Sequence, residues 1–142
     1  DKRLRQAQLQ MDASFQRLMV RLAERYFDVL SAEDNLTFAR AEMDSLAGQL
    51  EQARQRFDVG LIAITDVQEA QAGFDRASAQ VITAENAVQN AQERLREVTG
   101  ESHMSLWPLG DDLPLARPDP DSIEQWTETA LAQNLDLEAA LV

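Results

Sequence analysis

The sequence predicts an all-α fold: a long antiparallel coiled-coil helical hairpin, then a proline-rich connector and a short helix. Two observations lead to this fold class. Apolar residues recur in alternating steps of three and four along two long stretches, which is the heptad pattern of coiled coils. A short segment containing Gly60 separates the stretches, and glycine is typical of the point where a helix ends and the chain reverses.

The first heptad stretch predicts a helix from about Lys2 to Phe57. Among its heptad positions only Gln8 and Arg25 are polar. Gly60 can adopt the positive φ that ends a helix without strain, so we expect the turn to begin at Asp58. The apolar heptad positions are Leu4, Met11, Phe15, Leu18, Leu22, Val29, Ala32, Leu36, Ala39, Met43, Leu46, Leu50, Ala53 and Phe57.

The second stretch predicts a shorter return helix that ends near Val98, before Gly100. Thr65 or Asp66 is the expected N-cap, and Glu69 lies at the spacing of a capping box from Asp66. Because this helix is shorter, the apolar start of the first helix has no partner within the hairpin. Either the C-terminal segment or another chain must cover it. The expected core positions of the return helix are Val67, Ala70, Phe74, Ala77, Val81, Ala84, Val88, Ala91, Leu95 and Val98.

Further apolar residues lie outside the heptad stripe and widen the apolar face of both helices. A helix that is apolar on more than one side packs against more than one neighbour, so the hairpin is expected to belong to a bundle or ring. These residues are Tyr26, Phe27, Leu30, Phe38, Ala41, Ala72, Ala79, Ile82 and Ala87.

The rest of the chain is divided by its prolines. Residues 1–100 are the expected hairpin with its tip at 58–65, residues 101–120 an irregular connector, and residues 121–142 a short helix with the start of the next. Asp121 or Ser122 is the expected cap, and Asn134 the expected stop. Both ends of the chain fall inside helical patterns, so we interpret it as a segment of a longer protein.

Composition excludes several classes of function. The net charge of −12 argues against nucleic-acid binding, and the absence of cysteine excludes disulfides and thiolate metal sites. No apolar run is long enough for a membrane-spanning helix. His103 lacks catalytic neighbours in the sequence, and Asp111 with Asp112 is read as a solvated loop rather than a cation site. The expectation is no enzyme, no cofactor and no metal.

The tip has a structural and a functional interpretation. Gly60 and Asp66 suffice to make a turn, but the apolar Val59, Leu61, Ile62 and Ile64 are hard to bury at the end of a thin rod. Exposed apolar residues in such a place usually mark a docking surface. Arg56 and Asp66 flank them with opposite charge, and either clamp the turn or reach a neighbouring subunit.

The tip sequence Arg56-Phe57-x-Val59-Gly60-Leu61-x-x-x-Thr65-Asp66-Val67-x-x-Ala70 resembles the periplasmic tip of TolC-family outer-membrane efflux channels. Supporting matches are the segment 23–30, the segment from Asn86 to the Thr99-Gly100 pair, the Trp107-Pro108-Leu109 connector and the helix of Trp126. The similarity covers nearly the whole chain, in the expected order and spacing.

The resemblance implies a homotrimer whose periplasmic tunnel is built from such hairpins, with a β-barrel in the outer membrane. It implies passive drug export or type I protein secretion, with a periplasmic adaptor linking the channel to an inner-membrane pump. Val59, Gly60 and Leu61 would receive the adaptor, while Thr65 and Asp66, beside Arg56, would belong to the entrance gate. This segment would be the first of two repeats and would not itself span a membrane.

Two other functions remain open at this stage. A periplasmic adaptor also carries a coiled-coil hairpin, but β-rich halves would be expected to flank it, whereas these flanks are helical and proline-marked. A generic coiled-coil scaffold would explain the heptads but not the tip or the closing Thr99-Gly100.

Overall fold

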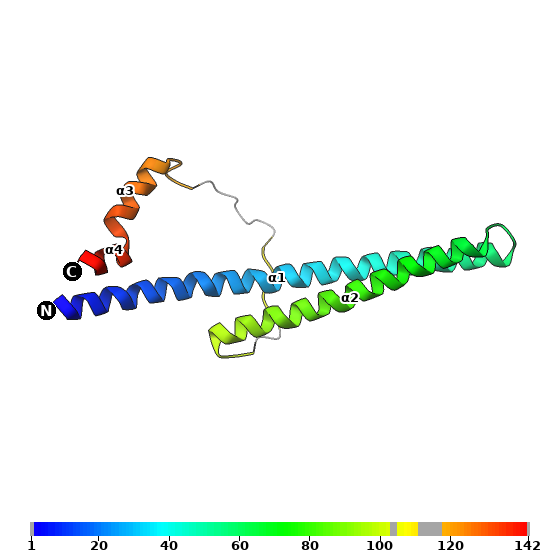
Figure 1. Cartoon of the computed structure of the whole chain (residues 1–142), viewed down its shortest axis with the longest axis horizontal. Coiled ribbons are helices and arrows are strands. Elements are labelled where there is room, and N and C mark those ends of the chain that lie inside the picture. The colour runs from blue at the N-terminus through cyan, green and yellow to red at the C-terminus, as the bar shows by residue number, and fades with distance from the viewer. Residues whose placement is uncertain (1, 103–104, 111–117, 142) are drawn as a thin grey trace. The chain divides into compact units, whose positions relative to one another are not determined.

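The computed structural model describes residues 2–102, 105–110 and 118–141, and all regular elements within them are helices (Figure 1). They are α1 (Lys2–Asp58), α2 (Ile64–Thr99), α3 (Ile123–Gln133) and α4 (Leu135–Leu141). The predicted all-α class is therefore confirmed. His103, Asp111, Asp112 and Pro114 lie outside the described residues.

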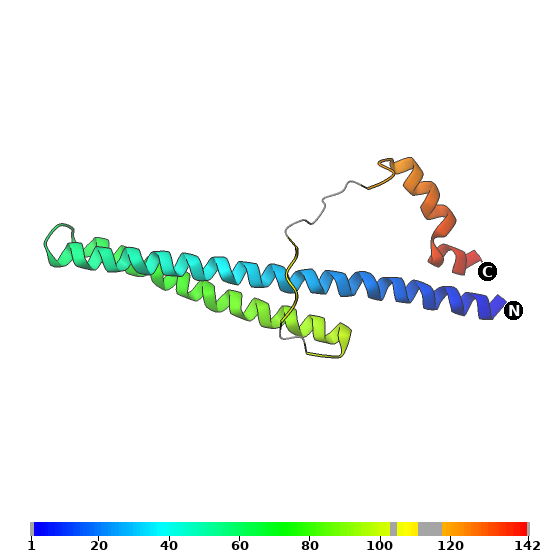
Figure 2. The same cartoon turned by 180° about the vertical axis from the view of Figure 1, so that it is seen from behind.

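The chain forms two compact units. One contains Glu24–Leu106, which is the hairpin of α2 with the second half of α1; the other contains Asp1–Ala23 with Trp107–Val142. Figure 2 shows the same pairing of α2 with α1 from behind.

The hairpin core follows the predicted heptads. All predicted heptad positions on α1 from Arg25 to Ala53, and all of those on α2, are buried or half-buried. Val29 and Leu95 are the most buried, at 0% and 2% exposure, and pack with Ala91. A second cluster joins Ala39 to Val81 and Ala84. Because small and large residues alternate along α2, the two helices can approach closely.

Polar side chains link the helices along the rim of this core. The Arg40 guanidinium lies 2.8 Å from the Glu85 carboxylate, and Arg54 donates a hydrogen bond of 2.8 Å to the Gln71 amide oxygen. Both links are solvent-exposed, so each stabilises the hairpin by less than about 1 kcal/mol. The apolar contacts supply most of the stability.

In the other unit, α4 lies against the start of α1. Arg17 pairs with Asp136 at 3.3 Å and Arg5 with Glu138 at 3.8 Å. The buried residues here are Leu9, Ala13 and Ala139, which are not those that the heptads predicted. Leu4, Met11, Phe15 and Leu18 remain exposed. The C-terminal segment thus folds back as one alternative foresaw, but it covers a different side of α1.

The predicted helix ends are partly right. Gly60 and Gly100 both have φ of 76°, and Gly100 caps α2 through its N–H bond to the Arg96 carbonyl. Ser122 caps α3, and Asn134 ends it. The N-cap of α2, however, is Ala63, so the prediction of Thr65 or Asp66 is wrong. Asp66 is instead the third residue of the helix, where its carboxylate reaches back to the Ala63 N–H.

Glycines inside the helices provide a stability test. A methyl group at Gly48 meets nothing within 4 Å, and one at Gly73 meets only Leu46 Cδ2 at 3.9 Å. We expect Gly48→Ala and Gly73→Ala each to raise the free energy of unfolding by about 0.5–1 kcal/mol, because alanine loses less backbone entropy in a helix. Urea unfolding followed by circular dichroism measures this. Gly100→Ala is the matched control: its positive φ should make the same change destabilising.

Candidate functional site

The tip turn is closed by backbone hydrogen bonds at the end of α1. The Gly60 N–H donates to the Phe57 carbonyl and the Leu61 N–H to the Arg56 carbonyl, both at 2.8 Å. This pair of bonds around a glycine in the left-handed region is the Schellman motif. The motif gives hydrogen-bond donors to two carbonyls at the end of α1 that have no partner within the helix. The turn therefore has a defined conformation.

The start of α2 closes the other side of the turn. Ala63 has extended backbone angles, φ −80° and ψ 157°, and no side-chain acceptor for the first amides of the helix. Its N–H donates to Asp66 Oδ2 at 3.2 Å, and its carbonyl accepts the Asp66 N–H at 3.1 Å. The segment between Val59 and Ala63 is therefore fixed at both ends.

The side chains of this turn are apolar and face solvent. Val59 is 70% exposed, Leu61 69% and Ile64 49%, whereas Ile62 is half-buried. A turn that served only to reverse the chain would not require these exposed side chains. Their exposure fits the docking interpretation of the sequence.

The charged residues predicted for the tip do not pair with each other. Arg56, Thr65 and Asp66 are all exposed. Among the described residues, the ion pairs found involve neither Arg56 nor Asp66, so these residues do not clamp the turn electrostatically. Arg56 contributes its backbone carbonyl to the turn, and Asp66 its carboxylate to the start of α2.

The hairpin also leaves apolar side chains exposed away from its core. Phe27, Phe38 and Ile82 are exposed, as are Ala41, Ala72, Ala79 and Ala87, whereas Tyr26 and Leu30 are half-buried. Most of the second apolar face predicted from the sequence is thus open to a further partner.

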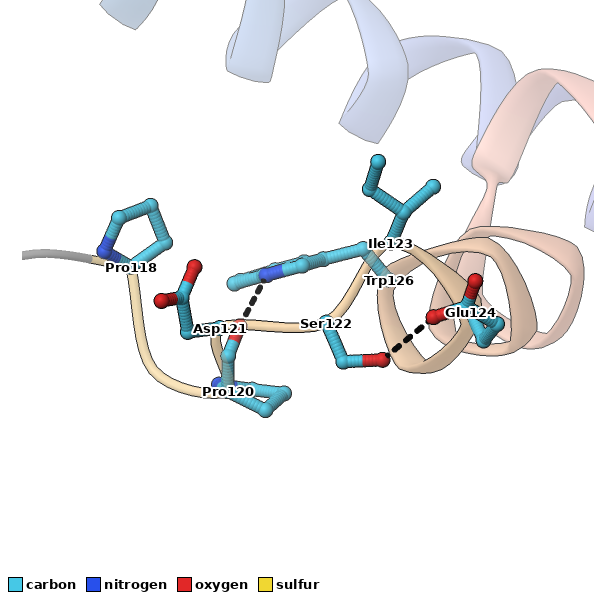
Figure 3. Close-up of a pocket in the computed structure, with 7 residues that line it drawn as sticks. All are labelled: Pro118, Pro120, Asp121, Ser122, Ile123, Glu124 and Trp126. Atoms are coloured by element: carbon cyan, nitrogen blue, oxygen red, sulfur yellow. Dashed lines mark hydrogen bonds between the residues drawn. The ribbon is translucent and has the colours of Figure 1, made fainter.

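A second candidate is the hollow before α3, lined by Pro118, Pro120, Asp121, Ser122, Ile123, Glu124 and Trp126 (Figure 3). The Trp126 indole N–H donates to the Pro120 carbonyl at 2.7 Å, and the Ser122 hydroxyl to a Glu124 carboxylate oxygen at 2.9 Å. These bonds tie the connector to the first turn of α3. Because they connect neighbouring parts of the chain, we assign the hollow a structural role.

Glu124 makes the start of α3 sensitive to pH. Its own backbone N–H and then the Ser122 hydroxyl donate to its carboxylate, which lowers the pKa of Glu124 below the ordinary value of 4.5. A lowered pKa in the folded state adds stability above pH 4.5, and this stability is lost as the pH falls through the lowered pKa. We expect the protection of the Gln125 and Trp126 amides, relative to their intrinsic exchange rates at each pH, to decrease as the pH falls through the lowered pKa, and Glu124→Gln to remove that dependence. Equal acid sensitivity in the glutamine variant would contradict this account.

The described residues contain neither a cluster of metal-ligating side chains nor a membrane-spanning helix. Nowhere in residues 2–102, 105–110 and 118–141 do three or more potential metal ligands gather. In the same ranges no helix has the length and apolar character needed to cross a membrane.

The fold and the tip together define the class of this protein. It is a long antiparallel helical hairpin, and its fixed turn presents apolar side chains to solvent. Comparison with known proteins specifies the class further. Residues 1–101 match the family described as outer membrane efflux protein. The chain belongs to this family.

Curated relatives cover most or all of the chain. It is 46% identical over 142 residues to the outer membrane protein TolC of Vibrio cholerae, and 39% identical over 123 residues to TolC of Escherichia coli. It is 34% identical over 124 residues to the alkaline protease secretion protein AprF of Pseudomonas aeruginosa. The matches cover 100%, 86% and 86% of this chain but only 32%, 24% and 26% of the relatives. The chain thus spans about a third or less of their length.

Proposed function

We propose that the chain is the first periplasmic hairpin of a longer outer-membrane channel that exports drugs or secreted proteins without catalysis. Family membership supports an efflux role, and the relatives' names refer to the outer membrane and to protease secretion. The exposed apolar surface on a fixed turn is the observation that carries the proposal. An adaptor hairpin or a generic scaffold is disfavoured by the family match.

In this proposal residues 1–100 form part of the tunnel wall, and residues 101–132 begin the equatorial region of the channel. The exposed apolar side chains of the hairpin then pack against neighbouring hairpins of a homotrimer. This fits the apolar side chains of α1 and α2 that the chain itself leaves exposed, Phe38 and Ile82 among them. The acidic net charge suits either solubility or the attraction of cations and repulsion of anions along such a passage.

Val59, Gly60 and Leu61 form the proposed docking surface for a periplasmic adaptor, which connects the channel to an inner-membrane pump. Because this chain has no cysteine, single cysteines can be introduced at chosen sites of the full-length protein, made cysteine-free elsewhere. Val59→Cys and Leu61→Cys should cross-link to the adaptor in cells. Ser45→Cys, exposed on α1 away from the tip, is the matched control. Equal cross-linking at all three positions would count against docking at the tip.

Arg56, Thr65 and Asp66 are the proposed residues of the entrance gate. Asp66 presents an exposed carboxylate beside the turn, where a donor of another hairpin can reach it. We expect Asp66→Ala to loosen the closed entrance, seen as higher conductance of the purified channel in bilayers and greater antibiotic sensitivity of cells. Glu69→Ala, one turn further along α2, serves as the control for loss of an exposed carboxylate. If Asp66→Ala changes neither quantity, Asp66 only stabilises the start of α2 through its bond to the Ala63 N–H.

A further inference from the structure

Ala63 and Asp66 are linked twice at the start of α2. The Asp66 carboxylate accepts the Ala63 N–H through Oδ2, and the Asp66 N–H donates to the Ala63 carbonyl. In a complete capping box the N-cap side chain would also accept an amide of the helix, but alanine has no oxygen there. The backbone of Ala63 therefore supplies both links to Asp66.

This arrangement uses only one oxygen of the carboxylate. An aspartate side chain has rotatable torsions and, without an anchor, would sample several rotamers at an exposed site. The bond to Oδ2 restricts those torsions. Among the hydrogen bonds found for the described residues, Oδ1 takes part in none, so it can accept a donor from outside the hairpin.

We infer that the Ala63 N–H is a positioning group, which orients the Asp66 carboxylate toward a hydrogen-bond donor on a neighbouring hairpin. This inference rests on the proposed gate role of Asp66. It adds that the stability of the closed entrance depends on the backbone amide of Ala63, three residues before Asp66. The Ala63 side chain itself has no part in the gate. The opening threshold of the entrance is then set partly by the geometry of the turn that a docking partner contacts.

The test removes the amide hydrogen and leaves the carboxylate in place. Proline lacks the N–H, and its fixed φ is compatible with the φ of −80° at Ala63, at the start of a helix. In the full-length protein we expect Ala63→Pro to raise single-channel leak conductance by about threefold to tenfold, the range expected for the loss of one ordinary hydrogen bond. Ala63→Ser keeps the N–H and should remain as closed as the unaltered protein.

A double variant separates positioning from damage to the turn. If Ala63 acts only through Asp66, Ala63→Pro adds no leak to Asp66→Ala. Additive leak in the double variant would show that proline distorts the turn, and would overturn the inference. If Ala63→Pro stays closed while Asp66→Ala leaks, the inference about Ala63 is also overturned. The proposed gate role of Asp66 would then still hold. A closed Asp66→Ala channel would instead contradict the proposed gate itself.

Another variant avoids any change to the backbone. The Asp66→Asn side chain can still accept the Ala63 N–H through its carbonyl oxygen, which turns its NH₂ group outward. Since the outward group is then a donor and not an acceptor, Asp66→Asn should leak as much as Asp66→Ala. A closed Asp66→Asn channel would show that the outward oxygen is not the acceptor, and would refute the proposed orientation.

Discussion

Gly60→Val in the full-length protein is expected to abolish most export while leaving the helix content nearly unchanged. Gly60 has φ of 76°, where a β-branched side chain is strained by about 1–2 kcal/mol or more. The strain falls on the turn that holds Val59 and Leu61, because Gly60 and Leu61 donate the bonds that close it. Export of a dye or a secreted protein from cells, compared with circular dichroism of the purified protein, measures the two effects separately.

The hairpin offers a matched control at the other end of α2. Gly100 has the same φ of 76°, and a Cβ atom would find open space at both glycines. Gly100→Val therefore introduces the same strain away from the tip, and export should persist. Gly60→Asn should also retain function, because asparagine tolerates the left-handed region. Undiminished export by Gly60→Val, or an equal loss in Gly100→Val, would contradict a specific role for the tip.

Leu95→Ala is expected to destabilise the hairpin by about 2–4 kcal/mol, since it leaves a cavity in the cluster that contains the most buried residues of the hairpin. Leu95 is 2% exposed and packs with Val29 and Ala91, with the half-buried Ala32 and Leu106 around them. Urea unfolding of the 142-residue chain measures the loss as a lower midpoint. The slope of the transition should stay constant if unfolding remains two-state.

Ile82→Ala, on the same helix, is the control for the loss of stability expected of Leu95→Ala. Ile82 is 58% exposed, so its truncation should cost the free chain less than about 1 kcal/mol. Measurements at two protein concentrations tenfold apart detect association of chains through this face. If the two substitutions lower the urea midpoint equally at the low protein concentration, the assignment of Leu95 to the core would be contradicted.

The sequence predicted the hairpin core well because the apolar core residues of both helices follow the same heptad period. On each helix they form a single stripe, and that stripe is buried or half-buried. The same reasoning was wrong at the start of α1, where Leu9 and Ala13 are buried in place of the heptad residues. There the covering element is α4, whose ion pairs join residues up to 133 positions apart. Periodicity shows that a face is apolar, but it does not show from which side a distant segment approaches.

At the tip, the chemistry of Gly60 made its position and conformation predictable, since few other residues adopt a positive φ. The cap of α2 was not predictable from residue preference, which favours Thr65 or Asp66 over Ala63. The signal that was available is the spacing of Asp66 three residues after Ala63, which lets an acidic side chain bind the cap amide.

The links between α1 and α2 also bear on how the hairpin folds. Arg54 and Gln71 are 17 residues apart, whereas Arg40 and Glu85 are 45 apart, so contacts near the turn close shorter loops. Because the entropy of loop closure increases with loop length, pairing should begin beside Gly60 and advance toward Val29 and Leu95. The same turn that is proposed to meet a partner in the finished channel would then nucleate folding. Substitutions there would be constrained by folding rate as well as by docking.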